Sequence, residues 1–167
     1  GGVGLNLISA ARLRGAGEII AIDIVEEKEV LALEHGATRF HSTFLQFLEK
    51  VDLIIDTTGS PDIIESAFGA LSGTGRLILV GQPAPGQSLR LPNAIQLFNG
   101  NGQAIRATQG GGMIPQNDIP RYVKLFELGQ LTTRHLITHR FNLDDVNLAF
   151  DTLKTGQAGR IIINIEG

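Results

Sequence analysis

The sequence predicts an α/β fold, a doubly wound parallel sheet with helices on both of its faces. Apolar runs rich in Ile, Val and Leu alternate along the chain with stretches of helical spacing, the pattern that builds such a sheet. The runs lack polar alternation, so we expect strands that are buried on both faces. At 167 residues, 43% of them hydrophobic, the chain can bury one core. We therefore expect a single domain over residues 1–167.

Each expected element has its own local signal. Strands are predicted where the apolar runs are densest, at residues 18–23, 51–56, 76–80 and 160–165, with a weaker one at 38–40. Helical spacing predicts helices at residues 4–14, 26–34, 61–71, 118–128 and 143–153. Gly15, Gly36, Gly129 and Gly156 follow helical patterns, as left-handed C-terminal residues do.

Two helix starts also carry capping signals. Ser60 precedes Pro61, which suits the first position of a helix, and Asn142 stands where its side-chain oxygen could meet the free amides of Asp144 and Asp145. Residues 81–103, with several prolines and glycines, are expected to form a long loop around one helical turn at residues 93–98.

Composition excludes several classes of function. The chain has no cysteine, so it contains no disulfide, no catalytic thiol and no thiolate ligand for a metal. A net charge of -3 without a Lys/Arg cluster argues against a nucleic-acid partner. We find no apolar run long enough to span a membrane and no signal-peptide pattern, so a cytoplasmic protein without a membrane partner is expected.

The first residues resemble a phosphate-binding turn. Gly1, Gly2, Val3 and Gly4 lead directly into an amphipathic helix, as the end of a G-x-G-x-x-G fingerprint does in a Rossmann fold. Glycine lets the backbone approach a pyrophosphate, and the helix N-terminus attracts that anion. Gly1 would be the second glycine of the fingerprint and Gly4 the third. Glycine pairs before helices are also common turns, which is the competing interpretation.

An acidic residue at the expected spacing strengthens the dinucleotide interpretation. Asp23 ends the second predicted element and lies 19 positions beyond Gly4, where an acid accepts hydrogen bonds from the adenosine ribose. A carboxylate at that place repels a 2′-phosphate, so NAD is expected rather than NADP. The alternative is that Asp23 only caps the turn at Glu26.

With these motifs the chain resembles the medium-chain dehydrogenase/reductases, in their zinc-type alcohol dehydrogenase branch. It is most similar to the bacterial aryl- and benzyl-alcohol dehydrogenases. The resemblance covers nearly the whole chain, and its main motifs are Gly1-Gly2-Val3-Gly4, Ile22-Asp23, Glu34-His35-Gly36-Ala37-Thr38, Asp56-Thr57-Thr58-Gly59, Leu79-Val80-Gly81 and Gly156-Gln157-Ala158-Gly159-Arg160. Residues 118–120 and 136–141 resemble the C-terminal helix and strand of that family.

The resemblance implies a cofactor site at the carboxyl ends of the strands. Asp23, with Ile24 beside it, and Lys28 match the residues that hold the adenosine ribose, and Arg160 matches an arginine that pairs with the pyrophosphate. The turn that flanks the adenine and its ribose is matched by Thr57, Thr58 and Gly59. The turn beside the nicotinamide ribose is matched by Val80, Gly81 and Gln82, and the backbone that orients the carboxamide by Ala107, Thr108 and Gln109. Taken singly, Thr57, Val80 and Ala107 could equally be selected by packing at strand ends.

The resemblance also implies partners and missing parts. The segment from Gly102 to Thr108 matches the edge strand through which family members pair, which implies a homodimer or homotetramer, although Arg106 departs from the usual apolar pattern. The first, central strand of the sheet is expected to be absent, so the chain by itself should bind NAD weakly or aggregate. The catalytic zinc of the family is held by cysteine and histidine in another domain.

These considerations predict the NAD(H)-binding part of a zinc-dependent dehydrogenase for small alcohols, aromatic ones included, with no catalytic and no metal-binding residue in this chain. His35, His41, His135 and His139 lack metal-ligand spacing, so we expect packing or surface roles. Two alternatives stay open: a zinc-free quinone or enone reductase of the same superfamily, and a binding module for NAD without chemistry of its own.

Overall fold

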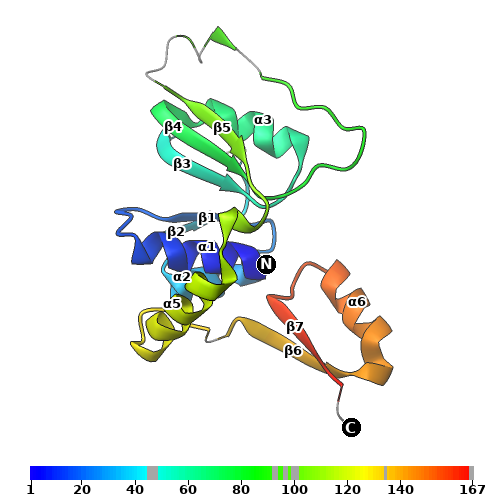
Figure 1. The fold of residues 1–167 in the computed structure, drawn as a ribbon. Coiled ribbons are helices and arrows are strands. Elements are labelled where there is room, and N and C mark those ends of the chain that lie inside the picture. The colour runs from blue at the N-terminus through cyan, green and yellow to red at the C-terminus, as the bar shows by residue number, and fades with distance from the viewer. Residues whose placement is uncertain (45–48, 92–93, 96–97, 99–101, 134, 166–167) are drawn as a thin grey trace. The chain divides into compact units, whose positions relative to one another are not determined.

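A computed structural model describes residues 1–44, 49–91, 94–95, 98, 102–133 and 135–165. The chain forms two compact units, one of residues Gly1–Ser42 with Pro115–Gly167 and one of residues Thr43–Ile114. All the strand pairs are parallel and alternate with helices, which confirms the predicted α/β class (Figure 1). The helical turn expected at residues 93–98 lies largely outside the described residues.

The first unit begins with a helix packed on a two-stranded parallel sheet. Its elements are α1 (Gly2–Leu13), β1 (Ile20–Ile22), the 3-10 turn η1 (Glu26–Lys28), α2 (Glu29–His35) and β2 (Arg39–His41). Strand β1 pairs with β2 from Ile20 opposite Arg39 to Ile22 opposite His41. The small buried core between these elements consists of Ile19, Ala21, Ala32 and Ala37, with Ile8, Ala11 and Phe40 against it.

A buried polar contact also joins α1 to α2. Ser9 and His35 are almost fully buried, and the hydroxyl of Ser9 lies 3.0 Å from Nδ1 of His35. Gly36 ends α2 in the left-handed conformation with a φ of 112°. A Cβ at this glycine would lie 2.6 Å from Cδ of Arg12 on α1, so the arginine side chain would have to move.

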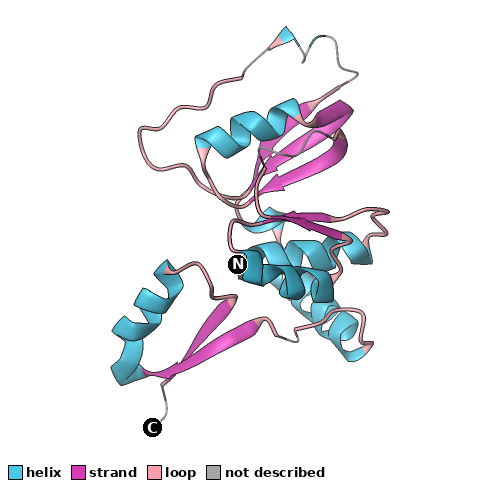
Figure 2. Ribbon diagram, turned by 180° about the vertical axis from the view of Figure 1, so that it is seen from behind, coloured by secondary structure: helices cyan, strands magenta, loops and turns pink. Residues whose placement is uncertain are grey.

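The later part of the first unit contains a second pair of parallel strands, and a helix connects the first of these strands to the second along the chain (Figure 2). Its elements are α5 (Pro115–Glu127), β6 (Ile137–Asn142), the 3-10 turn η3 (Leu143–Asp145), α6 (Val146–Lys154) and β7 (Arg160–Asn164). The strand and helix that the resemblance implied in this region are confirmed as β6 and α5.

The second unit is a three-stranded parallel sheet with the order β3-β4-β5. Its elements are β3 (Val51–Asp56), α3 (Pro61–Gly69), β4 (Leu71–Leu79), β5 (Ala104–Ala107) and the 3-10 turn η2 (Gly110–Gly112). The core consists of Ile64, Ala67, Phe68, Leu71 and Leu77. Strand β4 begins five residues before the expected strand at 76–80, because Leu71 already pairs with Val51 across a bulge.

The helix ends predicted at glycine residues are confirmed, whereas the predicted side-chain caps at helix starts are wrong. Gly15, Gly36, Gly129 and Gly156 all have positive φ, as expected for residues that end helices. Ser60 and Asn142 occupy the N-cap positions of α3 and η3, but neither side chain makes the expected capping hydrogen bond. The Ser60 N–H donates to the hydroxyl of Thr58, at 3.0 Å.

Candidate functional site

The first turn of α1 is tied to the chain segment that precedes β7. The Gly2 N–H, which lies in the predicted pyrophosphate-binding turn, donates to the Gly159 carbonyl at 3.1 Å. Within the part of the chain that the structure describes, the N–H groups of Val3 and Gly4 have no protein acceptor. Those two amides, at the positive end of a 12-residue helix, remain available to an anion.

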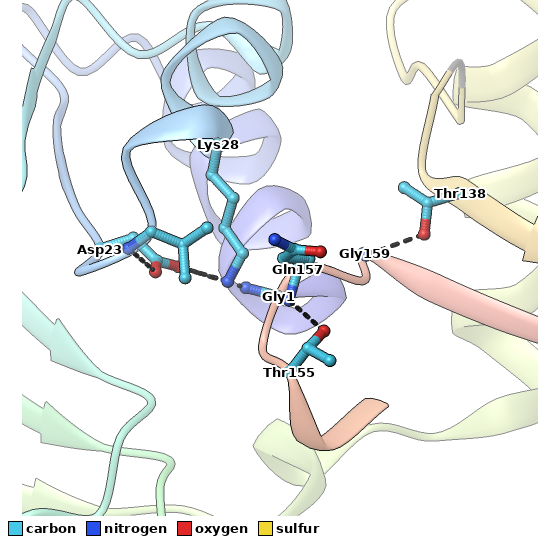
Figure 3. Close-up of polar contacts among 8 residues, drawn as sticks. Gly1, Asp23, Lys28, Thr138, Thr155, Gln157 and Gly159 are labelled. Atoms are coloured by element: carbon cyan, nitrogen blue, oxygen red, sulfur yellow. Dashed lines mark hydrogen bonds and ion pairs between the residues drawn. The ribbon is translucent and has the colours of Figure 1, made fainter. Parts of the chain in front are cut away.

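Glycine at positions 2 and 159 allows this contact. A Cβ at Gly2 would lie 3.1 Å from the Gly159 oxygen and 3.4 Å from Nε of Arg160, so the arginine side chain lies beside the start of α1. A Cβ at Gly159 would lie 2.9 Å from the Leu136 carbonyl oxygen. The Thr138 hydroxyl on β6 accepts the Gly159 N–H at 3.0 Å and so holds this peptide in place (Figure 3).

Asp23 follows β1 and turns its side chain towards the start of α1 (Figure 3). Its Oδ1 accepts the Val25 N–H at 3.1 Å, and its Oδ2 lies 2.8 Å from Nζ of Lys28 and 3.7 Å from the Gly1 nitrogen. The structure thus brings the fingerprint glycines, Asp23 and Lys28 together. The bond to Val25 shows that Asp23 also shapes the turn before η1, so the turn-capping alternative describes part of its contacts.

The opposite charges of Asp23 and Lys28 offset each other at this place. The side chains of Lys28 and Asp23 are 14% and 25% exposed, so their ion pair is partly withdrawn from water. Ile24, the neighbour of Asp23, is fully accessible with 87% of its surface exposed.

In the second unit, three segments predicted to contact the cofactor lie at the carboxyl ends of adjacent strands. Thr57, Thr58 and Gly59 follow β3, Val80, Gly81 and Gln82 follow β4, and Ala107 ends β5, with Thr108 and Gln109 after it. The Thr108 N–H donates to the Leu79 carbonyl at 2.9 Å, which keeps the third segment beside the second. The carboxyl ends of parallel strands are where open α/β sheets bind ligands.

The first two of these segments touch through their backbones. A Cβ at Gly81 would lie 2.2 Å from the Gly59 nitrogen, and a Cβ at Gly59 would lie 2.4 Å from the Gln82 carbonyl oxygen. Asp56, at the end of β3, accepts hydrogen bonds from Thr58 and Gly59, a role that sequence reasoning did not assign. Its sequence signals were its position at the end of a predicted strand and its place in the Asp56-Thr57-Thr58-Gly59 motif.

The described residues do not fit a zinc site. No group of three His, Cys, Asp or Glu side chains that could hold a metal occurs in the part of the chain that the structure covers. His35 contacts Ser9, Nδ1 of His135 lies 2.6 Å from a carboxylate oxygen of Glu34, and His139 stacks on Phe141. None of the helices described is long and apolar enough to cross a membrane.

Comparison with known proteins gives one family. Residues 2–127 match the model for the zinc-binding dehydrogenases. An S-(hydroxymethyl)glutathione dehydrogenase of Saccharomyces cerevisiae is 30% identical over 98% of this chain and 45% of its own length. The crystal structure of a benzyl alcohol dehydrogenase from Acinetobacter calcoaceticus superposes with a TM-score of 0.88 at 29% identity, over 98% of this chain and 47% of that one.

A more distant likeness concerns the fold alone. A short chain alcohol dehydrogenase from E. coli CFT073, solved with the cofactor NADH, is 20% identical with a TM-score of 0.79, over 97% of this chain and 49% of that one. The chain thus spans about half the length of the relatives it matches. Because the family model covers α1 through α5, most of the sequence contributes to the assignment. The chain belongs to the zinc-binding dehydrogenase family.

Proposed function

We propose that this chain is the NAD(H)-binding part of a zinc-dependent alcohol dehydrogenase. One observation carries the proposal: Asp23, at the end of β1, turns its carboxylate towards the start of α1 and towards Lys28. This is the arrangement in which a ribose hydroxyl and a diphosphate of one dinucleotide would be bound together. Membership of the zinc-binding dehydrogenases supports it.

In the first unit, charge and free amides suit the adenosine diphosphate half of the cofactor. The Val3 and Gly4 amides would donate to the diphosphate, and the planar guanidinium of Arg160, beside Gly2, would pair with it. Asp23 would accept ribose hydroxyls, with Lys28 beside it. The negative charge of Asp23 disfavours a 2′-phosphate, so we propose NAD rather than NADP.

In the second unit, we propose that three backbone turns also contact the cofactor. We propose that Thr57, Thr58 and Gly59 flank the adenine and its ribose, and that Val80, Gly81 and Gln82 lie beside the nicotinamide ribose. Ala107, Thr108 and Gln109 would orient the carboxamide. Their common position at the ends of three neighbouring strands supports this assignment.

The chemistry of the whole protein depends on groups beyond these residues. When bound, NAD would supply the hydride acceptor for alcohol oxidation, and Ala107, Thr108 and Gln109 would orient its carboxamide. The residues described here bind and orient the cofactor, and they offer no set of zinc ligands. This chain matches about half of the length of its relatives. We propose that the zinc ligands and most of the substrate site correspond to the other half.

An activity assay of the full-length protein tests this function. Activity with NAD and benzyl alcohol that is abolished by a zinc chelator and restored by added zinc is the expected result. Activity that resists the chelator would instead support a zinc-free reductase of the same superfamily. Binding of NADH without turnover of any alcohol would support a non-catalytic binding module.

We also propose that the protein pairs through β5. Ala104–Ala107 is the last strand of its sheet and pairs only with β4 among the described residues, so one row of its backbone groups is free to meet another strand. A two-fold axis beside such an edge gives a homodimer or, with a second interface, a homotetramer. Sedimentation velocity of the full-length protein should show no monomer at micromolar concentration, and a monomer would contradict the pairing.

A further inference from the structure

Asp56 is a carboxylate that the proposed binding scheme does not use. It is the last residue of β3, and only 5% of its surface is accessible. Its Oδ1 accepts the Thr58 N–H at 3.1 Å and the Thr58 hydroxyl at 2.6 Å, and its Oδ2 accepts the Gly59 N–H at 3.0 Å. A buried carboxylate requires such partners, because leaving it unpaired away from water is costly.

The backbone of the same residue holds the neighbouring strand end. The Asp56 carbonyl accepts the N–H groups of both Val80 and Gly81, at 2.9 and 3.0 Å. Asp56 is therefore bonded to the turn after β3 through its side chain and to the turn after β4 through its main chain. In a parallel β-ladder, neighbouring strands are joined by main-chain hydrogen bonds alone. The side-chain bonds of Asp56 to its own turn are therefore additional to the ladder.

Glycine contacts make the junction stiff. Gly59, with a φ of +68°, lies so close to the second turn that a Cβ on it would be 2.4 Å from the Gln82 oxygen. A Cβ on Gly81 would be 2.2 Å from the Gly59 nitrogen. A shift of the first turn therefore displaces the second one, because packed backbones leave no room for separate adjustment.

The donors around Asp56 are all uncharged. Among the ion pairs of the described residues none involves Asp56, in contrast to Asp23 with Lys28. Its negative charge is held by two N–H groups and a hydroxyl, all from the turn that we assign to the adenine side. This places the function of the carboxylate in shaping that turn rather than in a salt bridge.

We propose that Asp56 is a positioning residue for cofactor binding. Its carboxylate fixes the Thr57–Thr58–Gly59 turn, and its carbonyl fixes the Val80–Gly81 turn, so that both present their backbones to the dinucleotide in one geometry. Pre-organisation of this kind raises affinity because the chain does not have to be ordered during binding. The inference rests on the proposed NAD-binding function and adds a residue that need not touch the cofactor.

Asp56→Asn tests the proposal in the full-length protein. Asparagine has one acceptor oxygen in place of two, so at least one N–H of the turn would face an NH₂ group. We expect the Kd for NADH, measured by fluorescence titration, to rise by about tenfold or more, the effect of losing one charge-assisted hydrogen bond. Asp62→Asn is the matched control, because Asp62 is exposed in the first turn of α3. The Kd of this variant for NADH should equal that of the unsubstituted protein.

The fitted stoichiometry separates positioning from a purely structural role. If Asp56 only stabilised the fold, Asp56→Asn would reduce the fraction of binding-competent protein but leave the Kd of that fraction unchanged, and this result would overturn the proposal. Absence of NADH binding by the unsubstituted protein would overturn the proposed function, and the inference with it. Should Asp56→Asn not fold, Thr58→Val, which removes one donor to Asp56, should also raise the Kd; an unchanged Kd would again overturn the proposal.

Discussion

At the scale of single residues, two aspartates at the carboxyl ends of strands form similar turns in different surroundings. Asp23 accepts the N–H of Val25 and Asp56 that of Thr58, in each case two residues further along the chain. The Asp23 side chain is 25% exposed and paired with Lys28, whereas Asp56 is buried among neutral donors. Asp23 is thus accessible to a ligand, while the acceptors of Asp56 are occupied by its own turn.

Asp23→Asn should weaken NAD binding and reduce the discrimination against NADP. The substitution removes a charge that would accept ribose hydroxyls and repel a 2′-phosphate. We expect the Kd for NADH to rise about tenfold and that for NADPH to rise less or to fall, in titrations of the full-length protein. Glu27→Gln, an exposed neighbour on η1, should change neither value. Equal factors for both cofactors would show that Asp23 does not lie at the ribose.

Gly81→Ala should destabilise the protein through steric contact alone. Gly81 has no positive φ, but its Cβ would lie 2.2 Å from the Gly59 nitrogen and 2.6 Å from the carbonyl carbon of Thr57. We expect the free energy of unfolding in urea to fall by about 3 kcal/mol, as for severe overpacking. Gly69→Ala is the control, because nothing lies within 4 Å of its Cβ position in α3. Similar losses in the two variants would contradict the close approach.

At the scale of elements, helices are held to their neighbours by small buried polar contacts as well as by apolar packing. The core shared by α1, α2 and the β1–β2 pair contains mainly alanine and isoleucine, so it buries little apolar area. The Ser9 and His35 side chains lie at the same junction and are 1% and 0% exposed. Such a contact contributes specificity because an unpaired polar group at that depth is costly.

Ser9→Ala should therefore lower stability more than an exposed serine substitution does. The variant removes the hydroxyl 3.0 Å from Nδ1 of His35 and leaves that buried ring without this contact. We expect a loss of about 1–3 kcal/mol in the free energy of unfolding, measured by urea denaturation. Ser66→Ala on α3 removes only an exposed bond to the Asp62 carbonyl and should cost less than about 0.5 kcal/mol. A loss for Ser9→Ala no larger than for Ser66→Ala would show that the buried contact contributes nothing.

At the scale of the whole molecule, we expect cofactor binding and zinc-dependent chemistry to depend on different residues. The proposed contacts occur as one cluster in each compact unit, whereas the described residues contain no set of metal ligands. Removal of zinc from the full-length protein should accordingly abolish alcohol oxidation while changing the Kd for NADH less than about threefold. Parallel titrations before and after dialysis against a chelator measure this. A large rise in Kd would show that the metal orders the cofactor site.

The sequence alone determined the order and type of most elements, the glycine helix ends and the position of Asp23. These features depend on residue periodicity and on backbone conformations within a few residues, which are visible along the chain. The capping roles expected for Ser60 and Asn142 were wrong, because a side chain that can cap a helix is not obliged to do so. Strand ends were off by several residues wherever pairing partners extend a strand, as at β4.

Only the tertiary structure decided which strand ends meet. The contact of Gly59 with Gly81 and the hydrogen bond from the Gly159 N–H to the Thr138 hydroxyl follow from which strands pair and in what register. Residues far apart in sequence are brought within hydrogen-bond distance by that pairing, and no local pattern encodes it. The sequence could name residues suited to a dinucleotide, but parallel pairing of β3 with β4 turned two separate glycine turns into one rigid junction.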